Sequence, residues 1–127
     1  MEREIHRIRR TNYIIFGIFL FITVAVVLFF AVRRIQSNFT TEKWKRVPEH
    51  RTRIVHDLME DYELIGMTEA QVASLLGADD REKGYFIQDD RYVYWLGPER
   101  GLISIDSEWL ILDFQDGIVQ DRVLTTD

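Results

Sequence analysis

The sequence predicts an α+β protein with an N-terminal transmembrane helix, followed by two short helices packed on a three- to four-stranded antiparallel sheet. An uncharged apolar block, Tyr13 to Val32, lies near the N-terminus. Two short segments with apolar residues at three- and four-residue spacing follow it. From Tyr85 onward, runs of aromatic and β-branched residues alternate with Gly, Pro and Asp clusters. We therefore expect four parts: a basic tail (1–12), the transmembrane helix (13–32), a juxtamembrane linker (33–47) and one small α+β domain (48–127).

The apolar block is long enough to cross a bilayer. A helix of about 20 residues spans roughly 30 Å, the thickness of the hydrocarbon layer. A cleaved signal peptide has a shorter apolar region that ends in small residues. This block ends Phe29-Phe30-Ala31-Val32 and runs into Arg33 and Arg34. We expect an uncleaved anchor that contacts the lipid bilayer.

The basic residues on the two flanks of the block set its orientation only weakly. Arg3, Arg7, Arg9 and Arg10 precede it, and Arg33, Arg34, Lys43, Lys45 and Arg46 follow it. The positive-inside count is therefore nearly tied. The leading tail is short and basic, which favours a cytoplasmic N-terminus and an extracytoplasmic C-terminal domain in the cell membrane.

Composition excludes several classes of function. The chain has no cysteine, so it has no disulfide scaffold, thiolate zinc site or Cys nucleophile. Residues 41–127 carry ten Lys/Arg and nineteen Asp/Glu, a balance of −9. This acidic body argues against nucleic acid as a partner.

The first expected helix starts at Pro48, because proline suits the first helical position and disfavours helical geometry at Val47. One apolar stripe then recurs at helical spacing and is expected to face the core: Ile54, Val55, Leu58, Met59 and Tyr62.

The second expected helix runs from Glu69 to Leu76. Thr68 and Gln71 have the spacing of a capping box, in which each side chain bonds the backbone of the other. Gly77 is expected to end the helix in a left-handed conformation.

Five short runs have the composition of strands: Tyr85–Ile87, Arg91–Leu96, Leu102–Ile105, Glu108–Phe114 and Ile118–Leu124. Gln115-Asp116-Gly117 between the last two runs predicts a hairpin. Residues 97–101, Gly-Pro-Glu-Arg-Gly, predict a second turn.

The segment Gly66-Met67-Thr68 through Leu75-Leu76-Gly77 resembles the opening helix of the BamE/SmpA-like small envelope domain. Tyr92, Tyr94 and Trp95 stand where that family has an aromatic strand, and residues 110–119 are similar to its final hairpin. The resemblance covers about residues 50 to 124. The same shape of two helices and a sheet also resembles the β-lactamase-inhibitor-protein fold.

This resemblance implies a non-catalytic interaction domain outside the cytoplasmic membrane. Some members of the family are outer-membrane lipoproteins of an assembly machine. This chain has no lipid-attachment cysteine and keeps a transmembrane segment, so that assembly role is not carried over. The chain looks more like the anchored, uncharacterised members.

No residue pattern predicts catalysis. His50 and His56 are six positions apart, so on one helix they point in different directions and cannot share a metal. Asp79-Asp80 and Asp89-Asp90 lack the alternating spacing of a calcium loop and are expected to serve turns and solubility. We expect no catalytic residue, no metal, no cofactor and no enzyme activity.

One group of apolar residues is expected to contact a partner. Leu110, Leu112 and Phe114 share one face of a strand, which leaves Trp109 and Ile111 for the other, beside Trp95. Such a patch suggests a docking surface. The alternative is that Trp44 and the 35–47 segment fold over it, and the sequence leaves both interpretations open.

The leading functional hypothesis is a single-pass membrane protein that presents a small protein-interaction domain to the cell envelope. One alternative is an accessory subunit of a membrane complex whose transmembrane helix is the main contact. A small hydrolase or ligand-binding domain is the third.

Overall fold

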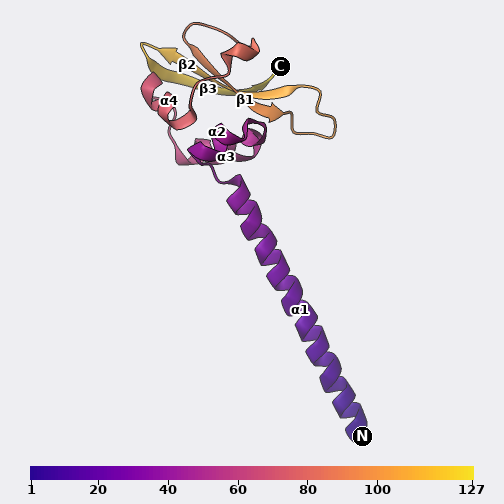
Figure 1. Ribbon diagram of the computed structural model, residues 1–127. Helices are drawn as coiled ribbons and strands as arrows, with labels where there is room; N and C mark the ends of the chain where they lie inside the picture. The colour runs from indigo at the N-terminus through magenta and orange to yellow at the C-terminus, as the bar shows by residue number, and fades with distance from the viewer. The chain divides into compact units, whose positions relative to one another are not determined.

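The computed structural model describes residues 1–127, which divide into two compact units, Met1–Gln36 and Ser37–Asp127. The fold class is α+β, as predicted: one long apolar helix, several short helices and an open three-stranded antiparallel sheet (Figure 1).

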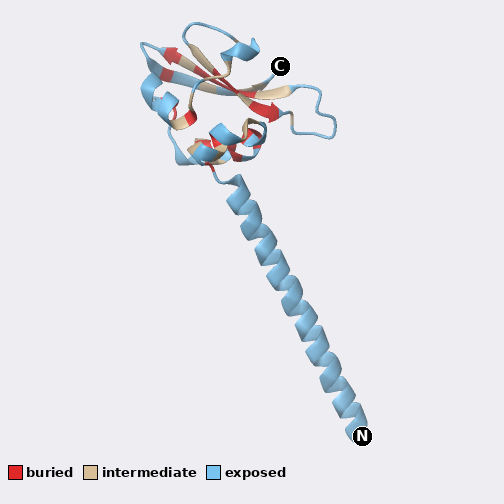
Figure 2. Cartoon of the chain, in the orientation of Figure 1, coloured by how far each residue is buried: buried red, intermediate tan, exposed pale blue.

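The first unit is a single helix, α1 (Glu2–Ser37), which includes the predicted Tyr13–Val32 span. None of its side chains is buried, and Figure 2 shows it exposed along its whole length. It is one helix near the N-terminus that is long and apolar enough to cross a membrane, a property that a signal sequence shares.

The second unit begins with α2 (Thr41–Arg46), inside the region expected to be a linker. Thr40 caps this helix by accepting a hydrogen bond from the Lys43 N–H. Trp44 is fully buried, and its ring lies 6.0 Å from Phe39 and 5.9 Å from Tyr94 between ring centroids. Residues from Phe39 onward therefore contribute to the core of this unit rather than only connecting it to α1.

A 3-10 turn, η1 (Pro48–His50), leads into α3 (Arg51–Asp61). The helical path starts at Pro48 as predicted, although the first turn is tighter than an α-helix. The expected stripe is buried at Ile54, Val55 and Leu58. Tyr62 ends the helix in an extended conformation and remains partly exposed.

The next helix, α4 (Glu69–Leu76), buries Val72 and Leu76. A second 3-10 turn, η2 (Arg81–Lys83), follows it. Figure 1 shows α2, α3 and α4 on one side of the sheet, with the segment after α4 crossing to the other side.

The sheet has the order β1-β2-β3, with β1 (Arg91–Pro98), β2 (Ser107–Gln115) and β3 (Ile118–Thr126). Asp116 and Gly117 form the predicted hairpin turn, with φ angles of 53° and 76°. A positive φ at both central residues is the geometry of a type I′ turn, which matches the twist of the strands.

Two of the five expected strands are loops instead. Tyr85–Ile87 and Leu102–Ile105 form no strand, because neither run finds a neighbouring strand to complete its backbone hydrogen bonds. Their apolar composition resembles that of strands, but in this fold the first covers the sheet and the second forms part of the β1–β2 loop.

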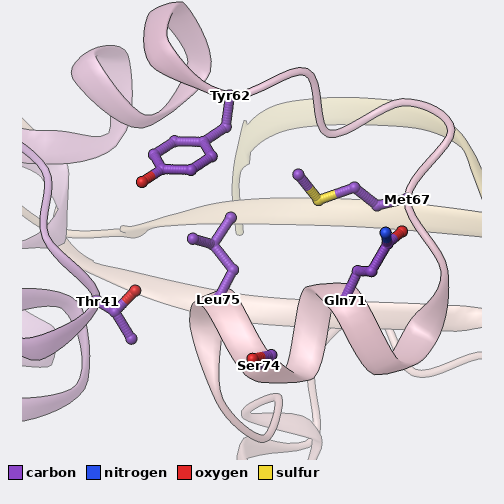
Figure 3. Close-up of a pocket in the computed structure, with 6 residues that line it drawn as sticks. All are labelled: Thr41, Tyr62, Met67, Gln71, Ser74 and Leu75. Carbon is purple, nitrogen blue, oxygen red and sulfur yellow. The ribbon is translucent and has the colours of Figure 1, made fainter.

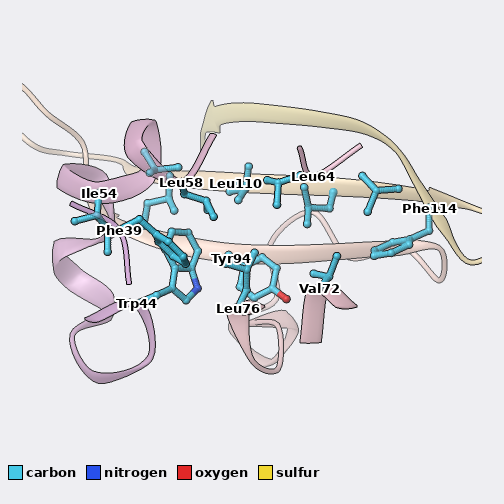
Figure 4. Close-up of a cluster of buried hydrophobic side chains, with 14 residues drawn as sticks. Phe39, Trp44, Ile54, Leu58, Leu64, Val72, Leu76, Tyr94, Leu110 and Phe114 are labelled. Atoms are coloured by element: carbon cyan, nitrogen blue, oxygen red, sulfur yellow. The ribbon is translucent and has the colours of Figure 1, made fainter. Parts of the chain in front are cut away.

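The main core lies between the helices and one face of the sheet (Figure 4). The helical side supplies, among others, Trp44, Val55, Leu58, Val72 and Leu76. The sheet side supplies Tyr94, Leu96, Leu110, Leu112 and Phe114. This core contains no residue of α1, so the second unit encloses its own hydrophobic interior.

Candidate interaction surfaces

The three residues predicted to bind a partner lie together on the sheet. Trp95 pairs with Trp109, and the neighbouring Val93 pairs with Ile111. Trp109 and Ile111 face away from Leu110 and Leu112, as the alternation of β2 predicted.

The predicted exposure of this face is wrong. Trp109 is 1% exposed and Ile111 is 6% exposed. Tyr85 and Phe86 cover them, with ring centroids 5.4 Å and 6.1 Å from the Trp109 ring. The alternative expectation, a cover made by Trp44 and its arm, is also wrong, because Trp44 belongs to the core on the opposite face.

The segment after η2 provides this cover. Gly84 has a φ of 85° and Phe86 a φ of 57°, so the chain bends sharply enough to bring the Phe86 ring onto the sheet. Trp95 stays partly exposed, with the Lys83 ammonium 4.7 Å above its ring. The Trp109 Nε1–H donates to Asp127 Oδ2 at 3.2 Å. This face is thus a second, smaller core rather than an open surface.

The predicted capping residues of α4 are confirmed. The Gln71 N–H donates to Thr68 Oγ1 at 3.2 Å, and the Thr68 N–H donates to Gln71 Oε1 at 2.9 Å. Gly77 has a positive φ of 79°, as expected for a glycine stop, but its ψ of −169° lies outside the left-handed helical region. That combination is essentially restricted to glycine.

An ion pair between the buried Arg51 and the half-buried Asp80 holds the outer edge of β1 and was not predicted. Arg51 is 4% exposed, and its NH1 donates to Asp80 Oδ2 at 2.8 Å and to the Trp95 carbonyl at 2.9 Å. The guanidinium also lies 4.8 Å from the Trp44 ring, and its Nε donates to the Trp44 carbonyl at 2.8 Å.

The two aspartates complete this edge. Asp80 Oδ2 accepts from the Trp95 N–H at 2.9 Å, and Asp79 Oδ2 accepts from the Val93 N–H at 3.2 Å. Asp79 and Asp80 were expected to serve turns and solubility. Instead, their carboxylates accept hydrogen bonds from backbone N–H groups of β1, a strand at the edge of the sheet. The sequence carried one signal for Arg51, because it precedes Ile54, Val55 and Leu58 on the same helical face.

Burial raises the pKa of Tyr94 strongly, and the nearby Asp79 adds to the effect. The Tyr94 hydroxyl donates to the Gly77 carbonyl at 2.9 Å, which anchors the end of α4 to β1. This tyrosine therefore stays protonated and has a structural role.

An open groove of about 380 Å³ lies beside α4 and is lined by Thr41, Tyr62, Met67, Gln71, Ser74 and Leu75. Figure 3 shows the Tyr62 ring and the Met67 and Leu75 side chains pointing toward one another. Its lining includes no carboxylate, histidine or basic group. The groove can accept an apolar side chain but offers no acid–base pair.

The loop between β1 and β2 is the most exposed apolar feature of the second unit. Leu102 is fully exposed, Ile103 is 76% exposed and Ile105 is 83% exposed. Arg100 and Glu108 form an ion pair of 2.9 Å at the base of this loop. Partial burial alone would raise the pKa of Glu108, but hydrogen bonds from Arg100 outweigh that effect, so the pKa is lowered.

No group of three or more His, Asp or Glu side chains lies close enough to hold a metal ion. No family model matches the chain, and no curated protein matches it either.

Proposed function

We propose that this protein is a single-pass membrane protein that presents a small, non-catalytic protein-interaction domain to the cell envelope. One observation carries the proposal: the chain consists of an apolar helix with no buried side chain and a separate unit with its own complete core. A helix that is apolar on every side needs lipid around it when no protein covers it.

The polar clusters of the second unit favour binding over catalysis. Arg51, Asp79 and Asp80 complete the edge of β1, and Tyr94 ties this strand to α4. Each of these groups is engaged in a contact that supports the fold. The resemblance of the capping segment and the final hairpin to BamE/SmpA-like envelope domains supports the same role, with the N-terminus cytoplasmic and the domain extracytoplasmic.

The competing proposal is an accessory subunit whose transmembrane helix is the main contact. The absence of a G-x-x-x-G pattern in α1 weakens that interpretation, because close helix packing in lipid favours small residues. An anchor exchange separates the two proposals. Residues 13–32 are replaced with an unrelated apolar helix of equal length, and the flanking arginines are kept.

A photoreactive amino acid at Ser74, beside the groove, then reports contacts in cells that make the protein naturally. The interaction-domain proposal predicts the same crosslinked products with either anchor. Loss of those products with the foreign anchor, while the protein remains in the membrane, would identify α1 as the contact element.

Topology is tested with a single cysteine at Thr126, since the chain has no other cysteine. An impermeant maleimide should label T126C in intact cells. Labelling only after lysis would place the domain in the cytoplasm and reverse the proposed orientation.

A further inference from the structure

We propose that the β1–β2 loop, residues 99–106, inserts its apolar tip into the surface of the bilayer that holds the anchor. This inference rests on the anchored state proposed above, and it adds a second membrane contact made by the folded unit.

The loop tip has the composition of an interfacial contact. Residues 101–105 read Gly-Leu-Ile-Ser-Ile and carry no charge. Leu102, Ile103 and Ile105 are all exposed, and Figure 2 shows this loop in pale blue. Adjacent aliphatic side chains without cover mark a site of contact with protein or membrane.

Hydrogen bonds at the base hold the tip away from the sheet. The Glu99 N–H donates to the Asp106 carbonyl at 2.9 Å, which closes the loop. The Arg100 backbone N–H donates to Glu108 Oε1 at 2.9 Å, and its guanidinium pairs with the same carboxylate. Ser104 Oγ donates to the Glu99 carbonyl at 2.6 Å, so the only polar side chain of the tip is satisfied within the loop.

The chain length between the two units keeps the folded unit near the lipid. Phe39, the first core residue, follows Val32, the last residue of the apolar block, by seven positions. α1 continues through Ser37, so these residues extend about 15 Å at most. A unit of this size has a radius of gyration of about 12 Å, so a tether of this length leaves the headgroups within reach of the unit's surface.

The side-chain types favour lipid over a protein partner. Hot spots of protein interfaces are enriched in Trp, Tyr and Arg, and Leu is under-represented there. Apart from Ser104, the side chains of the loop tip are all aliphatic, and the arginine at the base of the loop, Arg100, is already paired with Glu108. Because residues 41–127 have a balance of −9, attraction to anionic headgroups does not drive the contact. The insertion is apolar and should occur on zwitterionic lipid.

The test uses the full chain in phosphatidylcholine vesicles, with an environment-sensitive fluorophore on a single introduced cysteine. The probe site is Ile103→Cys. Gln115→Cys is the matched control. Gln115 is exposed and is the last residue of β2, at the end of this strand opposite to the β1–β2 loop. Val24→Cys, in the middle of the apolar block, reports whether the anchor is inserted.

We expect the I103C probe to show blue-shifted emission and quenching by lipids that carry a nitroxide on the upper acyl chain. The Q115C probe should show neither effect. Adding Leu102→Ser and Ile105→Ser to the I103C chain should lower its quenching to the Q115C level, and added salt should leave it unchanged.

Three outcomes overturn the inference. Equal quenching of I103C and Q115C, with V24C strongly quenched, would show that the anchor is inserted but that the loop does not contact the bilayer. A blue shift at I103C without nitroxide quenching would mean that protein, such as a second copy of the chain, covers the loop. No quenching at V24C would refute the anchor itself, and the loop proposal with it.

Discussion

Trp109 of β2 is buried beneath Tyr85 and Phe86, on the face of the sheet opposite the main core. The period of two correctly separates Trp109 and Ile111 from Leu110 and Leu112. It contains no information on whether another segment covers the second face. That cover comes from Tyr85 and Phe86, whose apolar composition had suggested a strand.

Because Trp109 is buried, Trp109→Ala should lower the free energy of unfolding by about 3–5 kcal/mol, the usual cost of removing a large aromatic side chain from a core. Trp95→Ala is the matched control and should cost less, since Trp95 is partly exposed on the same face. Urea unfolding of the full chain in detergent measures both variants through the emission of the remaining tryptophans. Equal costs for the two variants would show that the 84–90 segment leaves this face open.

The buried guanidinium of Arg51 gives a second residue-level prediction. Arg51→Met should destabilise the second unit by about 3 kcal/mol, because it leaves the half-buried Asp80 carboxylate without its cation. Arg53→Met, two positions along the same helix and exposed, should change stability by less than about 0.5 kcal/mol. Tryptophan emission during urea unfolding reports this unit alone, since all three tryptophans follow residue 40. Similar midpoints for the two variants would contradict the role assigned to the ion pair.

At the scale of single elements, local patterns were predictable and long-range ones were not. The capping box of α4 and the Asp116-Gly117 turn depend on residues within four positions of each other, and both are confirmed. The Arg51–Asp80 pair joins residues 29 positions apart, so only the folded chain reveals it. Leu102–Ile105 has the composition of a strand, but no neighbouring strand pairs with it. The sequence of one chain does not distinguish such a loop from a true strand.

The segment before Pro48 shows the same limit. Residues 33–47 were expected to be a linker, yet α2 places Trp44 between Phe39 and Tyr94. A lone tryptophan in a polar stretch is itself a signal of burial, because its apolar surface is large. The boundary between the two units therefore lies at Ser37 rather than at Pro48.

The capping box gives a prediction at this scale. Thr68→Ala should lower the free energy of unfolding by about 1 kcal/mol, because the Gln71 N–H loses its acceptor at the start of α4. Ser74→Ala lies in the same helix, exposed and away from its start, and should be neutral or slightly stabilising. Thermal unfolding of the full chain in detergent compares them. Equal stability of T68A and the parent chain would mean that the cap does not contribute to α4.

At the scale of the whole molecule, the proposed role depends on whether α1 stays attached to the folded unit. The second unit has its own core, and α1 has no buried side chain. An apolar helix of this length serves either as a retained anchor or as a signal that is removed. The proposed interaction role and the loop insertion both require that it is retained.

Intact mass measurement of the protein from alkali-washed membranes shows whether α1 is retained. Alkaline washing releases peripheral proteins and keeps those with an inserted helix, and mass spectrometry then reports whether α1 is still attached. We expect the full chain of 15.1 kDa in the washed membrane pellet. A shorter, alkali-soluble product that begins after the apolar block would show that the helix is a cleaved signal and would contradict the anchored protein described above.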